Sequence, residues 1–126
     1  EALVDELGVR DWVSFPGWLR REEVFHYLAT ADVGLAPDPS GMHLHWSNSI
    51  KAIEYMGLGV PVVGFELQEL MDSVGGAGVF VPDNSPEHMA IAIDAILSDP
   101  DRRRHLGKLG REAVETRLSW DRLADI

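Results

Sequence analysis

The sequence has no cysteine, few basic residues and no long hydrophobic run. The lack of cysteine excludes disulfides and thiolate metal sites. Only 11 lysines and arginines stand against 21 acidic residues, and the net charge of −10 disfavours nucleic acid as a partner. No apolar stretch is long enough to cross a bilayer, and the first residues are amphipathic and acidic, unlike a signal peptide. We therefore expect a cytoplasmic protein.

The chain of 126 residues, of which 45% are hydrophobic, is long enough for one core and not for two. Short continuous apolar runs alternate along it with helical patterns, which is typical of a parallel sheet covered on both faces by helices. The predicted fold class is therefore α/β, with a doubly wound parallel sheet. Strands are predicted over residues 12–15, 33–36, 60–64 and 78–81. Helices are predicted over residues 1–7, 21–29, 66–73, 86–97 and 101–116, and between the second and third strands.

The central stretch, from Ser47 to Phe65, reads SNSIKAIEYMGLGVPVVGF and predicts a helix followed by a buried strand. Ser47, Asn48 and Ser49 are residue types that cap helix starts, so we expect the helix to begin there. The free backbone N–H groups and the positive end of the helix dipole would then lie beyond the preceding strand. Such a helix end is suited to bind a phosphate.

Lys51 and Glu54 share one face of this helix because they are three residues apart. A cation followed by a carboxylate suits a diphosphate followed by a vicinal diol, since one carboxylate can accept hydrogen bonds from two hydroxyls. The same spacing is also typical of a solvated surface ion pair. Spacing alone leaves both interpretations open.

The string IKAIEYMGLGVPVVGFEL resembles the donor-site helix and following strand of family 4 glycosyltransferases of the GT-B fold, in the subgroup with a Lys-x-x-Glu-Tyr-Met core. Segments at residues 36–39, 69, 73–77 and 118–120 fit the same subgroup in order and approximate spacing. The resemblance implies a Rossmann-like domain that binds a nucleotide-diphosphate-sugar, within a retaining enzyme that transfers the sugar to a glycan, lipid or small-molecule acceptor. It implies no metal cofactor.

The resemblance also implies roles for individual residues. Glu54 would accept hydrogen bonds from the ribose hydroxyls. Lys51 would bind the diphosphate, together with the backbone N–H groups of Asn48, Ser49 and Ile50. The turn with Gly17 and Trp18 would border the base pocket. No catalytic residue is assigned.

The family pattern further implies that residues 1–126 are part of a C-terminal donor-binding domain, without its first two strands and without the acceptor-binding domain. We expect such a fragment to be inactive alone, and membrane association only through the missing domain. The bare edge of the strand at 33–36 would be covered by a rearranged strand at 12–15, by a partner chain, or by swapping in a homodimer.

Three residues that precede the predicted start of the central helix receive no role in binding the sugar or a metal. Trp46 stands where the more widespread Glu-x7-Glu motif has its first glutamate, so sugar contacts are not assigned there and packing is the preferred interpretation. His43 and His45 could share a face, but no third ligand is apparent, and we expect no metal site.

Two other classes of protein share this architecture. One is a non-catalytic doubly wound interaction domain, either flavodoxin-like or receiver-like. A receiver would need an acidic cluster with a strand-end aspartate and a later lysine for phosphorylation, a set that we do not find. A sugar-nucleotide epimerase is a poorer match to the sequence that follows Tyr55.

Overall fold

The computed structural model describes residues 1–39, 45–82 and 84–118, and for residues 45–49 it describes the backbone only. In the described chain, three strands form a parallel sheet in the order β1-β2-β3. They are β1 (Gly34–Ala36), β2 (Val62–Phe65) and β3 (Gly78–Val81). Gly34 is paired with Val62, which is paired in turn with Gly78.

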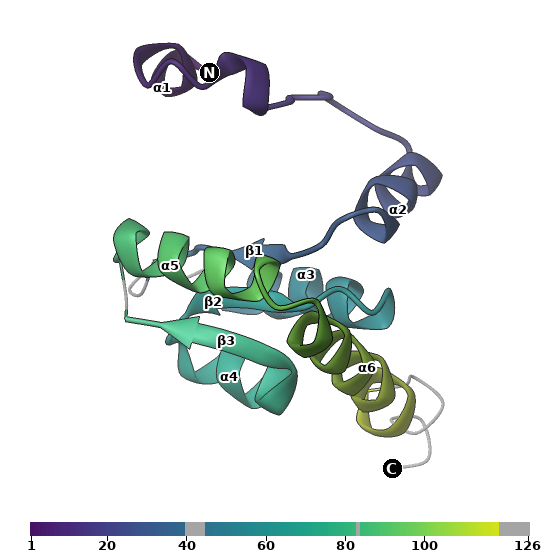
Figure 1. Ribbon diagram of the computed structural model, residues 1–126. Helices are drawn as coiled ribbons and strands as arrows, with labels where there is room; N and C mark the ends of the chain where they lie inside the picture. Colours follow the sequence, from purple (N-terminus) through teal and green to yellow (C-terminus); the bar gives the residue numbers. More distant parts are fainter. Residues whose placement is uncertain (40–44, 83, 119–126) are drawn as a thin grey trace.

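Helices cover both faces of this sheet (Figure 1). Val62 packs on one face against α3 (His45–Gly57) and α4 (Gln68–Val74). Its neighbour Val63 packs on the other face against α5 (Pro86–Leu97). The last helix, α6 (Pro100–Arg117), contributes side chains to both cores. A 3-10 helix, η2 (Gly75–Ala77), leads from α4 into β3. The predicted fold class is confirmed.

Several predicted element boundaries are also confirmed. The helix α2 (Arg21–Ala29) and the strand β3 have the predicted limits. The helix α5 begins at Pro86, and the hydroxyl of Ser85 accepts a hydrogen bond from the backbone N–H of His88 at 3.3 Å. Ser85 is therefore the N-cap that the sequence indicates.

The predicted start of α3 at residues 47–49 is wrong, because the helix already begins at His45. Serine and asparagine favour helix starts but are tolerated inside a helix, so their presence marks a cap only where the preceding backbone leaves the helical conformation. Here the backbone stays helical through all three residues.

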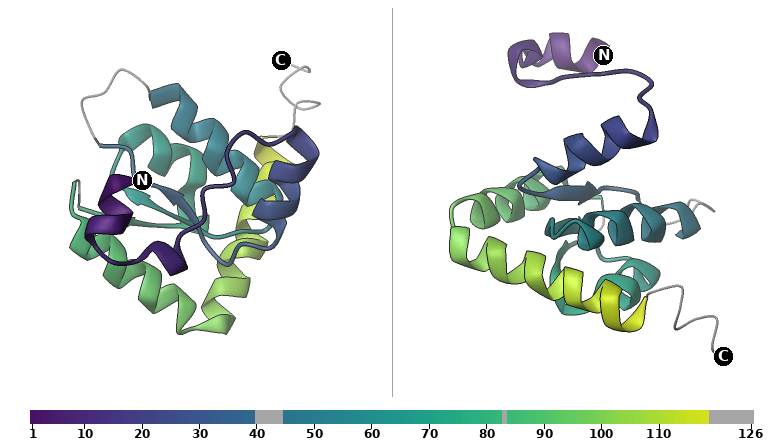
Figure 2. Two further views of the ribbon diagram at one scale, coloured as in Figure 1. Left: turned by 90° about the horizontal axis from the view of Figure 1, so that it is seen from above. Right: turned by 90° about the vertical axis from the view of Figure 1, so that its right-hand side faces the viewer.

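The first 20 residues stand apart from the sheet as an N-terminal arm (Figure 2). The arm contains α1 (Ala2–Glu6) and the 3-10 helix η1 (Arg10–Trp12), followed by extended backbone. The predicted strand over residues 12–15 is wrong, since these residues pair with no strand in the described part of the chain. An apolar run can favour extended backbone, but a strand also needs a hydrogen-bonded neighbour.

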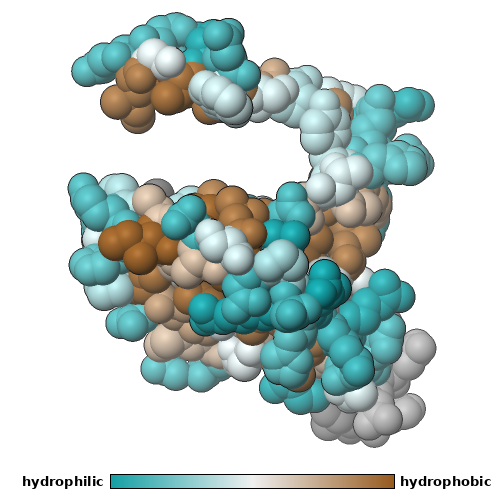
Figure 3. Space-filling view, viewed as in Figure 1, coloured by the Kyte–Doolittle hydropathy of each residue, from teal (hydrophilic) through white to brown (hydrophobic). Residues whose placement is uncertain are grey.

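The arm exposes large apolar side chains and does not cover β1. Trp12 is 88% exposed, and Leu3 and Leu7 are also exposed. Figure 3 shows hydrophobic surface on the side of α1 that faces the sheet across open space. Among the described residues β1 pairs with β2 alone, so coverage of its outer edge by a rearranged strand at 12–15 is also wrong. Coverage by a partner chain or by swapping stays a prediction.

Candidate functional site

The carboxyl ends of the three strands meet at one edge of the sheet because the strands are parallel. β1 ends at Ala36, β2 at Phe65 and β3 at Val81. In open parallel α/β sheets, ligands bind beyond this edge. The candidate site is therefore built from the loops after the strands and from the helix α3, which follows β1.

Lys51 of α3 lies at the carboxyl end of β1. Its Nζ atom is 3.8 Å from Oδ2 of Asp38, which follows the last residue of β1 by two positions. Both side chains are about half buried, with exposed fractions of 43% for Lys51 and 40% for Asp38. The surface ion pair that spacing suggests between Lys51 and Glu54 does not form, because Lys51 pairs with Asp38 instead.

Tyr55, one helical turn beyond Lys51, packs α3 against β1. Its ring lies directly against Gly34, and its hydroxyl donates a hydrogen bond to the carbonyl oxygen of Leu35 at 3.4 Å. Burial raises the pKa of Tyr55, and the negative charges of Glu54 and Asp38 raise it further. Both carboxylates therefore act on this hydroxyl. We call Asp38, Lys51, Glu54 and Tyr55 the α3–β1 cluster.

Glu54 is the exposed carboxylate of this cluster. Within the part of the chain that the structure describes, its side chain forms no ion pair and no hydrogen bond. An unpaired carboxylate can accept hydrogen bonds from two neighbouring hydroxyl groups of a ligand. The α3–β1 cluster thus combines a cation at the end of β1 with a carboxylate open to solvent.

The start of α3 at His45 changes which backbone N–H groups are free. The first intrahelical bond is donated three residues after the first helical residue, so within α3 the N–H groups without a partner inside the helix are those of residues 45–47. Asn48, Ser49 and Ile50 all lie beyond these three residues. The side chain of Ile50 is 62% exposed. The side chains of Asn48 and Ser49 lie outside the described residues.

Gly17 and Trp18, the predicted border of the base pocket, lie in the N-terminal arm. Gly17 adopts a φ of 73°, which fits a turn, and Trp18 is 87% exposed. No hydrogen bond or ion pair joins either residue to the α3–β1 cluster in the described structure.

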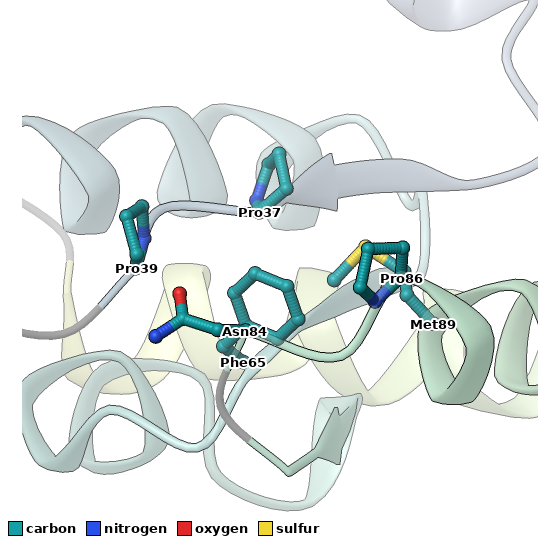
Figure 4. A pocket seen from close by; sticks show the side chains of 6 residues that line it. All are labelled: Pro37, Pro39, Phe65, Asn84, Pro86 and Met89. Carbon is teal, nitrogen blue, oxygen red and sulfur yellow. The ribbon is translucent and has the colours of Figure 1, made fainter.

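A pocket of about 300 Å³, which the sequence did not predict, opens at the same edge of the sheet (Figure 4). Its lining is almost wholly apolar, and the amide of Asn84 is its polar group. It is lined by Pro37, Pro39, Phe65, Asn84, Pro86 and Met89. The signal in the sequence is the set of prolines that follow the apolar strands, but sequence alone does not show that these loops converge.

No group of three histidine or acidic side chains that could hold a metal ion occurs among the described residues. His43 lies outside them, and so does the side chain of His45. None of the described helices is both long and apolar enough to span a membrane.

Comparison with known proteins gives one family and several relatives. The family model described as "Glycosyl transferases group 1" matches residues 1–99. An uncharacterized glycosyltransferase of Methanocaldococcus jannaschii is 30% identical over 98% of this chain and 31% of its own length. The MMP alpha-(1->4)-mannosyltransferase of Mycolicibacterium hassiacum is 30% identical over 98% of this chain and 30% of its own.

Two further relatives extend the comparison. A GDP-mannose-dependent alpha-(1-6)-phosphatidylinositol dimannoside mannosyltransferase of Mycobacterium tuberculosis is 32% identical over 89% of this chain and 28% of its own. The solved structure of sucrose-phosphate synthase from Thermosynechococcus elongatus is similar with a TM-score of 0.83 and 33% identity, over 98% of this chain and 30% of that one. The chain thus spans about 30% of the length of these proteins.

Proposed function

The chain belongs to the group 1 glycosyltransferases and has their Rossmann-like GT-B architecture, and from this premise we propose that it binds the nucleotide-sugar donor of such an enzyme. The proposed site is the α3–β1 cluster at the carboxyl edge of the sheet. The whole enzyme would transfer the sugar with retention of configuration to an acceptor. Family membership favours this function over an epimerase or an interaction domain.

The observation that carries the proposal is the pairing of Lys51 with Asp38 at the end of β1, with the carboxylate of Glu54, which has no partner among the described residues, on the same face of α3. A cation at a strand end can bind a diphosphate, and a solvent-open carboxylate can accept both ribose hydroxyls. Because Lys51 and Glu54 lie on one face of α3, a single nucleotide could reach both.

The proposed chemistry needs positive charge at the leaving group. When the bond between the sugar and the outer phosphate breaks, negative charge develops on the phosphate oxygen. Lys51 and the free N–H groups of the first turn of α3, those of residues 45–47, would stabilise this charge. We propose that this set of donors serves without a metal cofactor.

The base of the donor is proposed from the relatives. The Mycobacterium tuberculosis relative is named as GDP-mannose-dependent, so guanosine diphosphate is the first ligand to test, with uridine diphosphate beside it. The turn at Gly17 and Trp18 stays the proposed border of the base pocket.

The rest of the enzyme is proposed to lie outside this chain. The open space between the N-terminal arm and β1 would hold two further strands of the same domain, and a separate domain would bind the acceptor. The exposed Trp12 supports this proposal, and so does the pairing of β1 with β2 alone among the described strands. We expect no sugar transfer by residues 1–126 alone, and we propose a cytoplasmic enzyme that reaches membranes, if at all, through its other domain.

Isothermal titration calorimetry on the full-length protein tests the proposed site. Glu54→Ala should abolish or strongly weaken binding of the nucleoside diphosphate that the wild type binds. The matched control is Glu112→Ala, which removes an exposed glutamate from the middle of helix α6 and should leave binding unchanged. Equal affinity of Glu54→Ala and wild type would remove Glu54 from the site.

A further inference from the structure

Two ion pairs of similar length flank β1 at its opposite ends. At the amino end, Nε of Arg103 lies 3.6 Å from Oδ1 of Asp32. At the carboxyl end, Nζ of Lys51 lies 3.8 Å from Oδ2 of Asp38. The second pair differs in that Oδ2 of Asp38 is buried and accepts no hydrogen bond from any described group.

The contribution of the Lys51–Asp38 pair to the stability of the fold does not explain why Asp38 is there. An ion pair between half-exposed side chains contributes little to folding, while a buried carboxylate oxygen without a hydrogen bond is unfavourable. The contact at 3.8 Å is also longer than a hydrogen bond. Asp38 does have an electrostatic effect, because it places a negative charge beside the cation of the proposed donor site.

We propose that Asp38 is a specificity-determining residue that makes the site prefer the nucleotide-sugar over the free nucleoside diphosphate, which is the product. The inference rests on the proposed function, with the outer phosphate of the donor beside Lys51. The donor-binding proposal uses Asp38 only as the partner of Lys51, and the inference adds a role in discriminating between the two ligands.

The physical basis is a difference of one charge between the two ligands. Transfer of the sugar forms a bond between the sugar carbon and the oxygen of the acceptor hydroxyl, and it breaks the bond between the sugar carbon and the outer phosphate oxygen. The electron pair stays on that oxygen, and the proton of the acceptor hydroxyl is released. The outer phosphate therefore ends the reaction with an additional negative charge, which is largely retained at neutral pH because the second pKa of a terminal phosphate is about 6.

Asp38 repels the product more strongly than the donor because the additional charge appears at the phosphate beside Lys51. Both ligands use the same lysine, so any effect of Asp38 on the position of Lys51 acts on both affinities. The repulsion by Asp38, in contrast, changes the ratio of the two dissociation constants. For one unit charge several ångströms away in a partly solvated site, the ratio should change by roughly threefold to tenfold.

The test is the ratio of two dissociation constants in the full-length protein, that of guanosine diphosphate divided by that of GDP-mannose. Uridine diphosphate and UDP-glucose are run in parallel. Asp38→Asn removes the charge and should lower the ratio by roughly threefold to tenfold, with a smaller change at high salt. Asp38→Ser is a second neutral variant and should behave alike, whereas Asp38→Glu keeps the charge and should retain most of the wild-type ratio.

Asp32→Asn is the matched control, because it removes the carboxylate of the other ion pair and should leave the ratio unchanged. A ratio in Asp38→Asn and Asp38→Ser that equals or exceeds the wild-type ratio overturns the inference while leaving the proposed function intact. A wild-type protein that binds none of the four nucleotides overturns the proposed function, and the inference with it.

Discussion

The ring of Tyr55 lies directly against Gly34, where the first carbon of any side chain would overlap it. This contact lets α3 approach β1 closely, and the hydroxyl of Tyr55 then reaches the carbonyl of Leu35. The position of α3 on β1 in turn determines where Lys51 and Glu54 lie relative to the end of the strand. Packing at Gly34 is thus a condition for the proposed site.

Gly34→Ala should destabilise the fold by about 1–3 kcal/mol, because the ring of Tyr55 must move or leave its rotamer. The measurement is the free energy of unfolding in urea. Gly76→Ala is the control, since a side chain there meets no atom within 4 Å, and its effect should stay within about 0.5 kcal/mol. Equal stability of the two variants would contradict the packing argument.

Ser85→Ala should destabilise the protein by about 1 kcal/mol through loss of the N-cap of α5. The hydroxyl of Ser85 satisfies the backbone N–H of His88, which would otherwise lack a partner inside the helix. Ser98, at the other end of α5, makes no side-chain hydrogen bond in the described structure, so Ser98→Ala is the control. Thermal unfolding followed by circular dichroism would show a lower Tm for Ser85→Ala alone if the cap contributes as argued.

Tyr55 should make the stability fall at alkaline pH. Its folded pKa is raised above the ordinary value of 10.0, first by burial and then by the charges of Glu54 and Asp38. The unfolded chain therefore loses this proton first, so the stabilisation is complete below pH 10 and is lost as the pH rises toward the folded pKa. Urea unfolding from pH ~8 to pH ~11 should show a steeper fall for wild type than for Tyr55→Phe. Parallel curves for the two proteins would mean that Tyr55 titrates alike in both states.

Some helices and strands could be predicted from the sequence because their limits depend on a few neighbouring residues. The strand at 78–81 and the helices at 21–29 and 86–97 have the predicted limits, because apolar periodicity and a cap at Ser85 act over a few residues. The alternation of short apolar runs with helices was enough to predict a parallel sheet covered on both faces.

Features that depend on distant partners were not predictable in this way. Residues 12–15 have the composition of a strand, but no described strand lies beside them. The pairing of Lys51 with Asp38 joins two elements across a long loop, and helical spacing suggested Glu54 as the partner instead. The apolar pocket likewise arises where the loops after β1 and β3 meet the end of β2 and the start of α5, which no single segment of sequence records.

A crystal structure of the full-length protein with a bound nucleoside diphosphate tests the central claim most directly. The account predicts that both ribose hydroxyls donate hydrogen bonds to the carboxylate of Glu54 and that the outer phosphate lies beside Lys51, at the carboxyl end of β1. A nucleotide whose ribose and phosphates bind away from both side chains would contradict it.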